Sequence, residues 1–207
     1  GGGAAAVRGV GARRGHVRIF LTMRATAAIA DLLTGQQLLA MGDVGPCALI
    51  DGRIVPMSPT GGEHGFLEFR LARFLGNFVE EQGLGLVLGG EVGLYTRRNP
   101  DRVRGADIAV VSRTRLPQPP QSGFLEIAPE LVVEIMSPDD RWGDVKEKID
   151  EYFGVGVLWV WIVEARTKSL LVFRSATSFQ KLAGNETLRG EGFLSGFELP
   201  LARLFGG

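Results

Sequence analysis

Hydrophobic residues recur along the chain at either helical or strand-like spacing. The clearest helical pattern covers residues 62–82, where the apolar stripe consists of Leu67, Leu71, Phe74, Leu75 and Phe78. Gly83 follows at the position where a glycine commonly ends a helix. Weaker helical patterns cover residues 26–41, interrupted by Gly35, and residues 141–153. Three helices are therefore expected, with a final helical turn at 200–205.

Short apolar runs bounded by turn residues predict strands elsewhere. The runs at 47–50 and 53–57 flank Asp51-Gly52, a dipeptide suited to a type I′ turn, which indicates a hairpin. Further strands are predicted at 84–95, 104–112, 130–136, 157–163, 168–174 and 178–183. This order indicates one α/β domain with a central mixed β-sheet flanked by helices.

Composition narrows the class of protein. The 207 residues are 45% hydrophobic and 22% charged, with a formal net charge of zero, as in ordinary globular domains. A neutral chain is a poor candidate for binding duplexes through phosphate contacts alone. Cys47 is the only cysteine, which excludes an intrachain disulfide and a zinc site built on several thiolates. No apolar run approaches the roughly 20 residues of a membrane span, so a cytoplasmic location without membrane contact is expected.

The first residues differ from the rest of the chain. Residues 1–24 are rich in Gly, Ala and Arg and lack the apolar core of a signal peptide. We expect them to be a leader or tag outside the core, and the domain to span 25–207.

Two acids stand inside strongly apolar runs. Asp107 lies in Ala-Asp-Ile-Ala-Val-Val, and Glu134 lies in Leu-Val-Val-Glu-Ile-Met. A desolvated carboxylate is costly unless it is paired, hydrogen-bonded or bound to a cation. A divalent-metal site explains both acids. The alternative for Asp107 is a strand-end acid bonded to a backbone N–H or to Arg104.

Lysines and a second acidic position extend this hypothesis. The chain has 19 Arg but only 4 Lys, and Lys146 and Lys148 both follow closely after Glu134. An ammonium can neutralise a phosphate or orient a water, although Lys148 could equally form a surface pair with Asp144. Glu63 opens the long helix, where an acid is favoured by the helix dipole in any case.

Other polar residues have simpler explanations. His64 fits a core-edge histidine, and Asp139 or Asp140 fits a helix N-cap. Six arginines lie within 97–115 and would suit a polyanion or a solvated rim; they are Arg97, Arg98, Arg102, Arg104, Arg113 and Arg115. No phosphate-binding glycine fingerprint, nucleophile elbow or His-Glu-x-x-His motif is present. Carboxylate-and-lysine metal chemistry remains.

Three ordered motifs resemble a known family. They are Ala106-Asp107-Ile-Ala-Val-Val, the run from Ala128 to Pro138 that contains Glu134, and Asp144-x-x-x-Lys148-x-x-x-Tyr152. Together with Glu63-His64-Gly65 and the closing Gly-Phe-Leu-Ser-Gly-Phe-Glu-Leu-Pro-Leu, they resemble the Uma-two family. That family comprises endonucleases of the PD-(D/E)xK, restriction-endonuclease-like superfamily. The resemblance covers about residues 30–205.

The resemblance implies a fold and roles for specific residues. It implies a restriction-endonuclease-like core in which Asp107, Glu134 and the backbone carbonyl of Ile135 bind Mg²⁺ or Mn²⁺. The superfamily lysine normally follows the Glu by two residues, where this chain has Met136, so its role would pass to Lys148, with Lys146 as the substitute. Glu63 would match an acid found on the first helix of many members. Leu158, Trp159 and Glu164 depart from the family pattern, away from the expected metal.

The resemblance therefore implies a metal-dependent endonuclease acting on nucleic acid, with DNA as the expected substrate. A homodimer is consistent with a fold that often cuts both strands by pairing subunits. Two alternatives remain at this stage: an inactive nuclease-fold binding or assembly module, and a hydrolase of another phosphoester.

Overall fold

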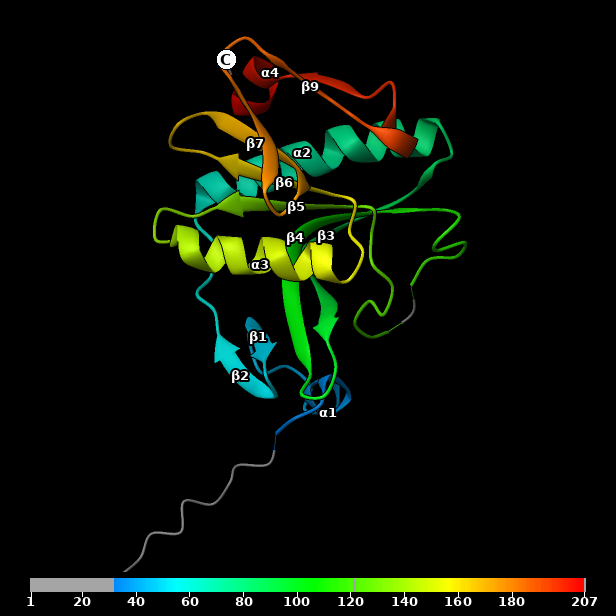
Figure 1. The fold of residues 1–207 in the computed structure, drawn as a ribbon, viewed down its shortest axis with the longest axis vertical. Coiled ribbons are helices and arrows are strands. Elements are labelled where there is room, and N and C mark those ends of the chain that lie inside the picture. Colours follow the sequence, from blue (N-terminus) through cyan, green and yellow to red (C-terminus); the bar gives the residue numbers. More distant parts are fainter. Residues whose placement is uncertain (1–31, 121, 207) are drawn as a thin grey trace, which may run out of the picture. The chain divides into compact units, whose positions relative to one another are not determined.

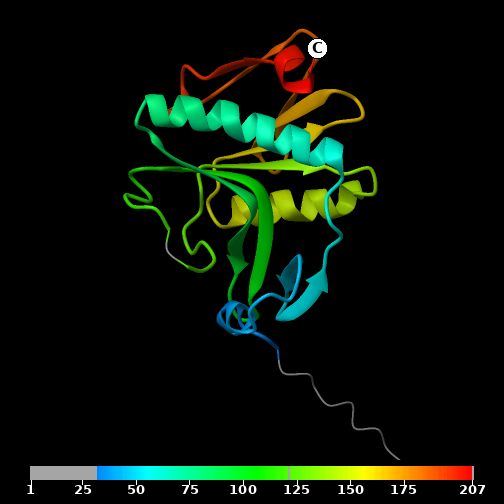
Figure 2. The same cartoon turned by 180° about the vertical axis from the view of Figure 1, so that it is seen from behind.

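A long, bent β-hairpin joins two parts of the main sheet (Figures 1 and 2). The structure is a computed structural model that describes residues 32–120 and 122–206. Strands β3 (Gly85–Arg97) and β4 (Arg102–Ser112) pair antiparallel along most of their length. On its other edge β4 pairs first with β1 (Cys47–Ile50) and then with β5 (Leu131–Met136). One edge of β4 therefore pairs with two different strands, β1 and β5.

The main sheet is mixed. Its order is β2-β1-β4-β5-β6-β7-β8, with β3 paired to β4. Strand β6 (Trp159–Glu164) runs parallel to β5, and the connection between them is α3 (Trp142–Gly154). The other pairs are antiparallel and include β2 (Arg53–Pro56), β7 (Ser169–Ser175) and β8 (Ser178–Ala183). The expected mixed sheet flanked by helices is confirmed.

Helices cover both faces of this sheet. Figure 1 shows α2 (Gly62–Glu81) and α3 on opposite sides of β5 and β6. The face under α2 also receives β9 (Thr187–Arg189), the short 3-10 helix Gly192–Leu194, β10 (Glu198–Pro200) and α4 (Leu201–Phe205). The α2 side chains Leu67, Leu71, Leu75 and Val79 are buried there, and each contributes about 1.5–3 kcal/mol.

The sequence predicted these main elements closely. The helix expected at 62–82 is α2, and the one expected at 141–153 is α3. Asp51 and Gly52 have φ of 52° and 73°, as the type I′ turn requires. The strand predictions are also confirmed, but the small β9–β10 pair was not predicted.

Two helix starts differ from expectation. Among the described residues, the helix predicted at 26–41 is only α1 (Gly35–Ala40), because Thr34 caps it in a capping box with Gln37. Helix α3 begins after Arg141 rather than after an acidic cap, because Asp140 instead accepts a hydrogen bond from Ser137 N. The expected leader, residues 1–24, and the domain start at 25 lie outside the described residues. Among the helices that the structure describes, none is long and apolar enough to span a membrane.

Candidate metal centre

The candidate centre lies where β4 leaves β1 and joins β5. Strand β4 pairs with β1 at Val103, and its pairing with β5 begins at Ile108. Asp107 stands between these two positions and is 3% exposed. The fork in the sheet therefore places a carboxylate in the interior, next to strands that come from both directions.

Asp107 is held by the neighbouring strand. Its Oδ2 accepts a hydrogen bond of 2.6 Å from Ile135 N, just beyond the last backbone pair of β4 and β5. A side-chain oxygen thus replaces a carbonyl in the ladder. The sequence had suggested, as an alternative to a metal ligand, that Asp107 bonds a backbone N–H or Arg104. The bond to a backbone N–H is present, whereas Arg104 bonds Glu151. The contact brings Asp107 beside Glu134, the residue before Ile135.

Glu134 is buried and accepts two hydrogen bonds from α3. Lys148 Nζ lies 2.6 Å from its Oε2, and the Tyr152 hydroxyl lies 2.5 Å from its Oε1. Burial raises the pKa of Glu134, and the charge of Asp107 adds to this effect while Lys148 opposes it. Sequence analysis named Tyr152 only as part of a motif; its spacing of one helical turn from Lys148 is the signal that places it on the same face.

Lys146 and Lys148 have different partners, and only Lys148 lies at the candidate centre. Lys148 reaches Glu134, whereas Lys146 forms a pair with Asp150 on the surface, 3.1 Å away. Burial lowers the pKa of Lys148, but the carboxylates of Glu134, Asp107 and Glu91 outweigh it and raise that pKa. The ammonium therefore stays charged inside the site. The surface pair of Asp144 and Lys148 does not form.

Helix α2 approaches Asp107 with a histidine and an acid. His64 Nε2 lies 3.2 Å from Asp107 Oδ1 and 3.9 Å from Glu68 Oε2. The Asp107 carboxylate raises the pKa of His64, against the effect of burial. Glu68, one turn after His64, was missed by sequence analysis. Glu63 instead lines a separate pocket with Ser137 and Glu164.

A second acid that sequence analysis missed comes from a β-bulge. Gly89 pairs with Ile108 and Val92 with Ala106, so Gly90 and Glu91 together face Asp107. Glu91 has φ of 60°, which is strained for a residue with a side chain. Bulges of this kind commonly re-aim side chains near functional sites. The alternation of apolar and polar residues along the sequence did not indicate this bulge.

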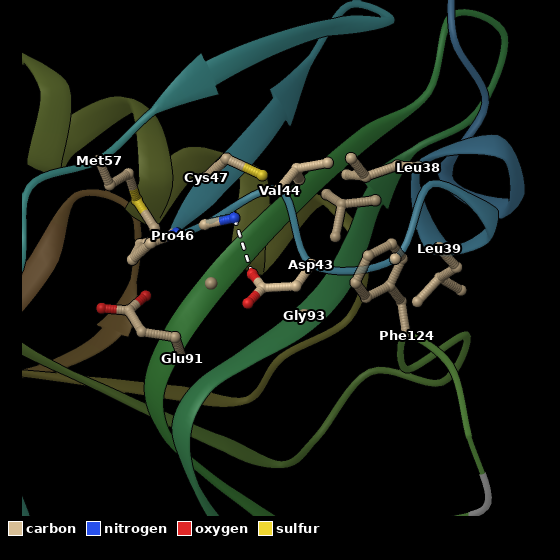
Figure 3. Close-up of a pocket in the computed structure, with 14 residues that line it drawn as sticks. Leu38, Leu39, Asp43, Val44, Pro46, Cys47, Met57, Glu91, Gly93 and Phe124 are labelled. Atoms are coloured by element: carbon tan, nitrogen blue, oxygen red, sulfur yellow. Dashed lines mark hydrogen bonds between the residues drawn. The ribbon is translucent and has the colours of Figure 1, made fainter.

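Glu91 also faces an apolar pocket of about 310 Å³. Figure 3 shows it near Pro46 and Met57, with Leu39 and Phe124 on the far side of the pocket. Although the side chain remains exposed, partial burial raises its pKa to about 7, and Asp107 and Glu134 add to the shift. The carboxylates of this region therefore repel one another.

The arginine-rich stretch is largely neutralised within the protein. Arg102 pairs with Asp51, Glu147 and Glu151, and Arg104 pairs with Glu151. Further pairs join Arg97 to Asp51, Arg98 to Glu126 and Arg115 to Glu130. These contacts tie α3 and the β1–β2 hairpin to β4. They reduce the charge that this stretch could offer to a polyanion.

The donor set fits a divalent cation. The carboxylates of Glu134, Asp107 and Glu91 act on one ammonium, Lys148, while Glu68 lies beside Asp107, and burial raises the pKa of both Glu68 and Glu134. His64 Nε2 is buried and, among the described residues, makes no hydrogen bond, although it lies 3.2 Å from Asp107 Oδ1. Two buried acids, two more acids close to them and an imidazole nitrogen beside Asp107 form an environment that a bound cation would stabilise.

These features define an α/β protein with a carboxylate-rich centre at the fork of its mixed sheet. Residues 36–202 match the model of the Uma2 family, described as "Putative restriction endonuclease". The chain belongs to the Uma2 family.

A solved structure shows the same fold. It is described as a "putative nuclease belonging to DUF820" from Anabaena variabilis, with a TM-score of 0.71 and 20% sequence identity. The match covers 84% of this chain and 98% of that one. A search of curated proteins finds no match.

Proposed function

We propose that this chain is a metal-dependent endonuclease that hydrolyses phosphodiester bonds of nucleic acid, with DNA as the expected substrate. One observation carries the proposal: Asp107 bonds Ile135 N while the adjacent Glu134 bonds Lys148, so two acids and an ammonium share one buried corner. Membership of the Uma2 family supports a nuclease-like activity.

Each residue of the centre would have a distinct role. Asp107, Glu134 and the carbonyl of Ile135 would hold Mg²⁺ or Mn²⁺. When bound, the ion supplies Lewis acidity and lowers the pKa of water. Tyr152 fixes the rotamer of Glu134. Lys148, held at 2.6 Å from Glu134, would offset negative charge that develops on the phosphate or orient the attacking water.

The test is cleavage of supercoiled plasmid, single-stranded DNA and RNA with Mn²⁺ or Mg²⁺. Wild type should cut at least one substrate, and Glu134→Gln should cut none. Lys148→Gln should lower the rate by about 10²-fold. Lys146→Gln is the matched control and should keep the wild-type rate, because Lys146 pairs with Asp150 at the surface. Wild-type cleavage by Glu134→Gln would overturn the assignment.

A second candidate function is a catalytically inactive assembly module with a nuclease fold. The pairing of five of the six arginines within 97–115 favours it, because that stretch then offers little charge to a polyanion. This module would bind a protein partner, including a second copy of the chain, and would cut none of the substrates above. A homodimer is compatible with both candidates.

A further inference from the structure

His64 presents a buried ring nitrogen to two carboxylates. The residue is 8% exposed, and its Nε2 lies 3.2 Å from Asp107 Oδ1 and 3.9 Å from Glu68 Oε2. Within the described part of the chain, no hydrogen-bond geometry satisfies this nitrogen. An Nε2 lone pair that faces carboxylate oxygens is unfavourable, and either a proton on Nε2 or a bound cation relieves it. A metal ion at this position would therefore replace that proton.

The other ring nitrogen is already engaged. His64 Nδ1 lies 3.2 Å from Ser137 Oγ. A metal-binding histidine usually donates its second N–H to such a partner, which fixes the tautomer and leaves the first nitrogen free to coordinate. Ser137, at the end of β5, thus orients the imidazole toward Asp107.

The acids are also oriented from outside the cluster. Glu68 Oε1 accepts a hydrogen bond of 3.0 Å from Gly90 N in the bulge, which leaves Oε2 on the side of His64. Asp107 uses Oδ2 for Ile135 N and keeps Oδ1 toward His64. Each carboxylate therefore has one oxygen anchored and one directed at the imidazole.

The spacing suits an ion. One ligand atom from each of the three residues lies within 4.8 Å of the others. Bonds of about 2.1 Å to a six-coordinate ion separate ligand atoms by about 3.0 Å when adjacent and about 4.2 Å when opposite. The two histidine distances fall within this interval.

We propose that His64, Glu68 and Asp107 form a cation site that prefers a first-row transition-metal ion over Mg²⁺. Imidazole nitrogen suits such ions, whereas Mg²⁺ prefers oxygen ligands and retained waters. Three protein ligands leave the other positions of a six-coordinate ion open for water or a phosphate oxygen. This inference rests on the proposed function in that both use Asp107, and it adds the class of metal ion that the site would bind. Its test measures metal binding and does not require nuclease activity.

The chain allows a direct test because it has two histidines, His16 and His64. Zn²⁺, which is diamagnetic, is titrated into ¹⁵N-histidine-labelled His16→Gln protein, so that His64 gives the only imidazole signals. We expect Zn²⁺ to shift the Nε2 resonance while Nδ1 keeps its proton. Saturable Zn²⁺ binding without a change at Nε2 would overturn the inference, as would the absence of saturable binding.

Affinities of variants supply the second measurement. His64→Gln and Glu68→Gln should each weaken Mn²⁺ and Zn²⁺ binding by about tenfold or more, and His64→Gln should change Mg²⁺ binding much less. Glu80→Gln, at the exposed end of α2, is the control with the same loss of charge. Wild-type Mn²⁺ and Zn²⁺ affinity in both His64→Gln and Glu68→Gln would contradict the inference.

The two proposals fail separately. If Glu134→Gln abolishes cleavage while His64→Gln and Glu68→Gln bind metal normally, only the cation site is wrong. If the histidine signal responds to Zn²⁺ but Glu134→Gln cuts like wild type, only the assignment of catalysis to Glu134 is wrong.

Discussion

The hydroxyl of Tyr152 on α3 lies 2.5 Å from Oε1 of Glu134 on β5, and both groups are buried. A hydrogen bond to a charged group commonly contributes about 1.5–3 kcal/mol, and its loss leaves the acceptor without a partner. This contact therefore links the stability of the domain to the geometry of its candidate metal centre.

Tyr152→Phe should lower the free energy of unfolding by about 2 kcal/mol, as measured by urea denaturation. The chain contains a matched control, because its only other tyrosine is Tyr95, whose buried hydroxyl has no hydrogen-bond partner among the described residues. Tyr95→Phe should change stability by less than about 0.5 kcal/mol. Equal effects of the two substitutions would contradict the role given to the Tyr152 hydroxyl.

Glu134 and Lys148 should be energetically coupled. A double-mutant cycle with Glu134→Gln and Lys148→Gln should give a coupling energy of about 1–3 kcal/mol, because the pair lies at 2.6 Å with Glu134 buried. The exposed pair Lys146–Asp150 should give about 0.5 kcal/mol or less in the same experiment. A coupling no larger than that of the surface pair would show that Lys148 is not fixed by Glu134.

Glu91 should make stability depend on pH. Burial raises its pKa from the usual value of 4.5 to about 7 in the folded protein, so the native state binds more protons than the unfolded state between these values. Stability should therefore fall as pH rises from 5 to 8. Solvent exposure of the side chain reduces the size of the effect.

The corresponding measurement is denaturation of wild type and Glu91→Gln at pH 5 and pH 8. Glu91→Gln should gain stability relative to wild type at pH 8, because it removes an acid that repels Asp107 and Glu134. Glu80→Gln serves as the control of equal charge. A Glu91→Gln advantage that is the same at both pH values would contradict the raised pKa.

Gly105 should be required for the position of Glu91. A Cβ at Gly105 would collide with Oε2 of Glu91, the movable end of a flexible side chain. Gly105→Ala should therefore cost less than about 1 kcal/mol while displacing the carboxylate. In a Gly105→Ala background, Glu91→Gln should lose its pH-dependent advantage. If Glu91→Gln still stabilised the Gly105→Ala protein more at pH 8 than at pH 5, the position given to the Glu91 carboxylate beside Gly105 would be wrong.

Much of the architecture followed from sequence because its signals are local. The stripe from Leu67 to Phe78 determines which face of α2 is buried, and Asp51-Gly52 specifies the hairpin turn. Glu134 could be singled out because apolar neighbours on both sides indicated burial on both faces of its strand. The sequence offered Lys148 and Lys146 as candidates for the ammonium group near Glu134. In the structure Lys148, on α3, contacts Glu134, on β5.

The remaining parts of the site depend on contacts between distant segments. Glu91 faces Asp107 only because β3 has one extra residue in its ladder, which periodicity does not reveal. Glu68 gains its position from the path of α2 past the fork in the sheet, and it is Glu68 that lies beside His64 and Asp107, while Glu63 lines a different pocket. The sequence left open whether the arginines within 97–115 form a polyanion surface or a solvated rim, and Arg102 and Arg104 pair with acids on other elements.

The central claim is that Asp107 binds a divalent cation. Calorimetric titration of Mn²⁺ into wild type and Asp107→Asn tests it most directly, because Asn keeps an oxygen for Ile135 N and removes the charge. Asp150→Asn, in the exposed pair with Lys146, is the matched control. We expect saturable Mn²⁺ binding to wild type and Asp150→Asn, and no such binding to Asp107→Asn. Undiminished Mn²⁺ binding by a folded Asp107→Asn protein would contradict it.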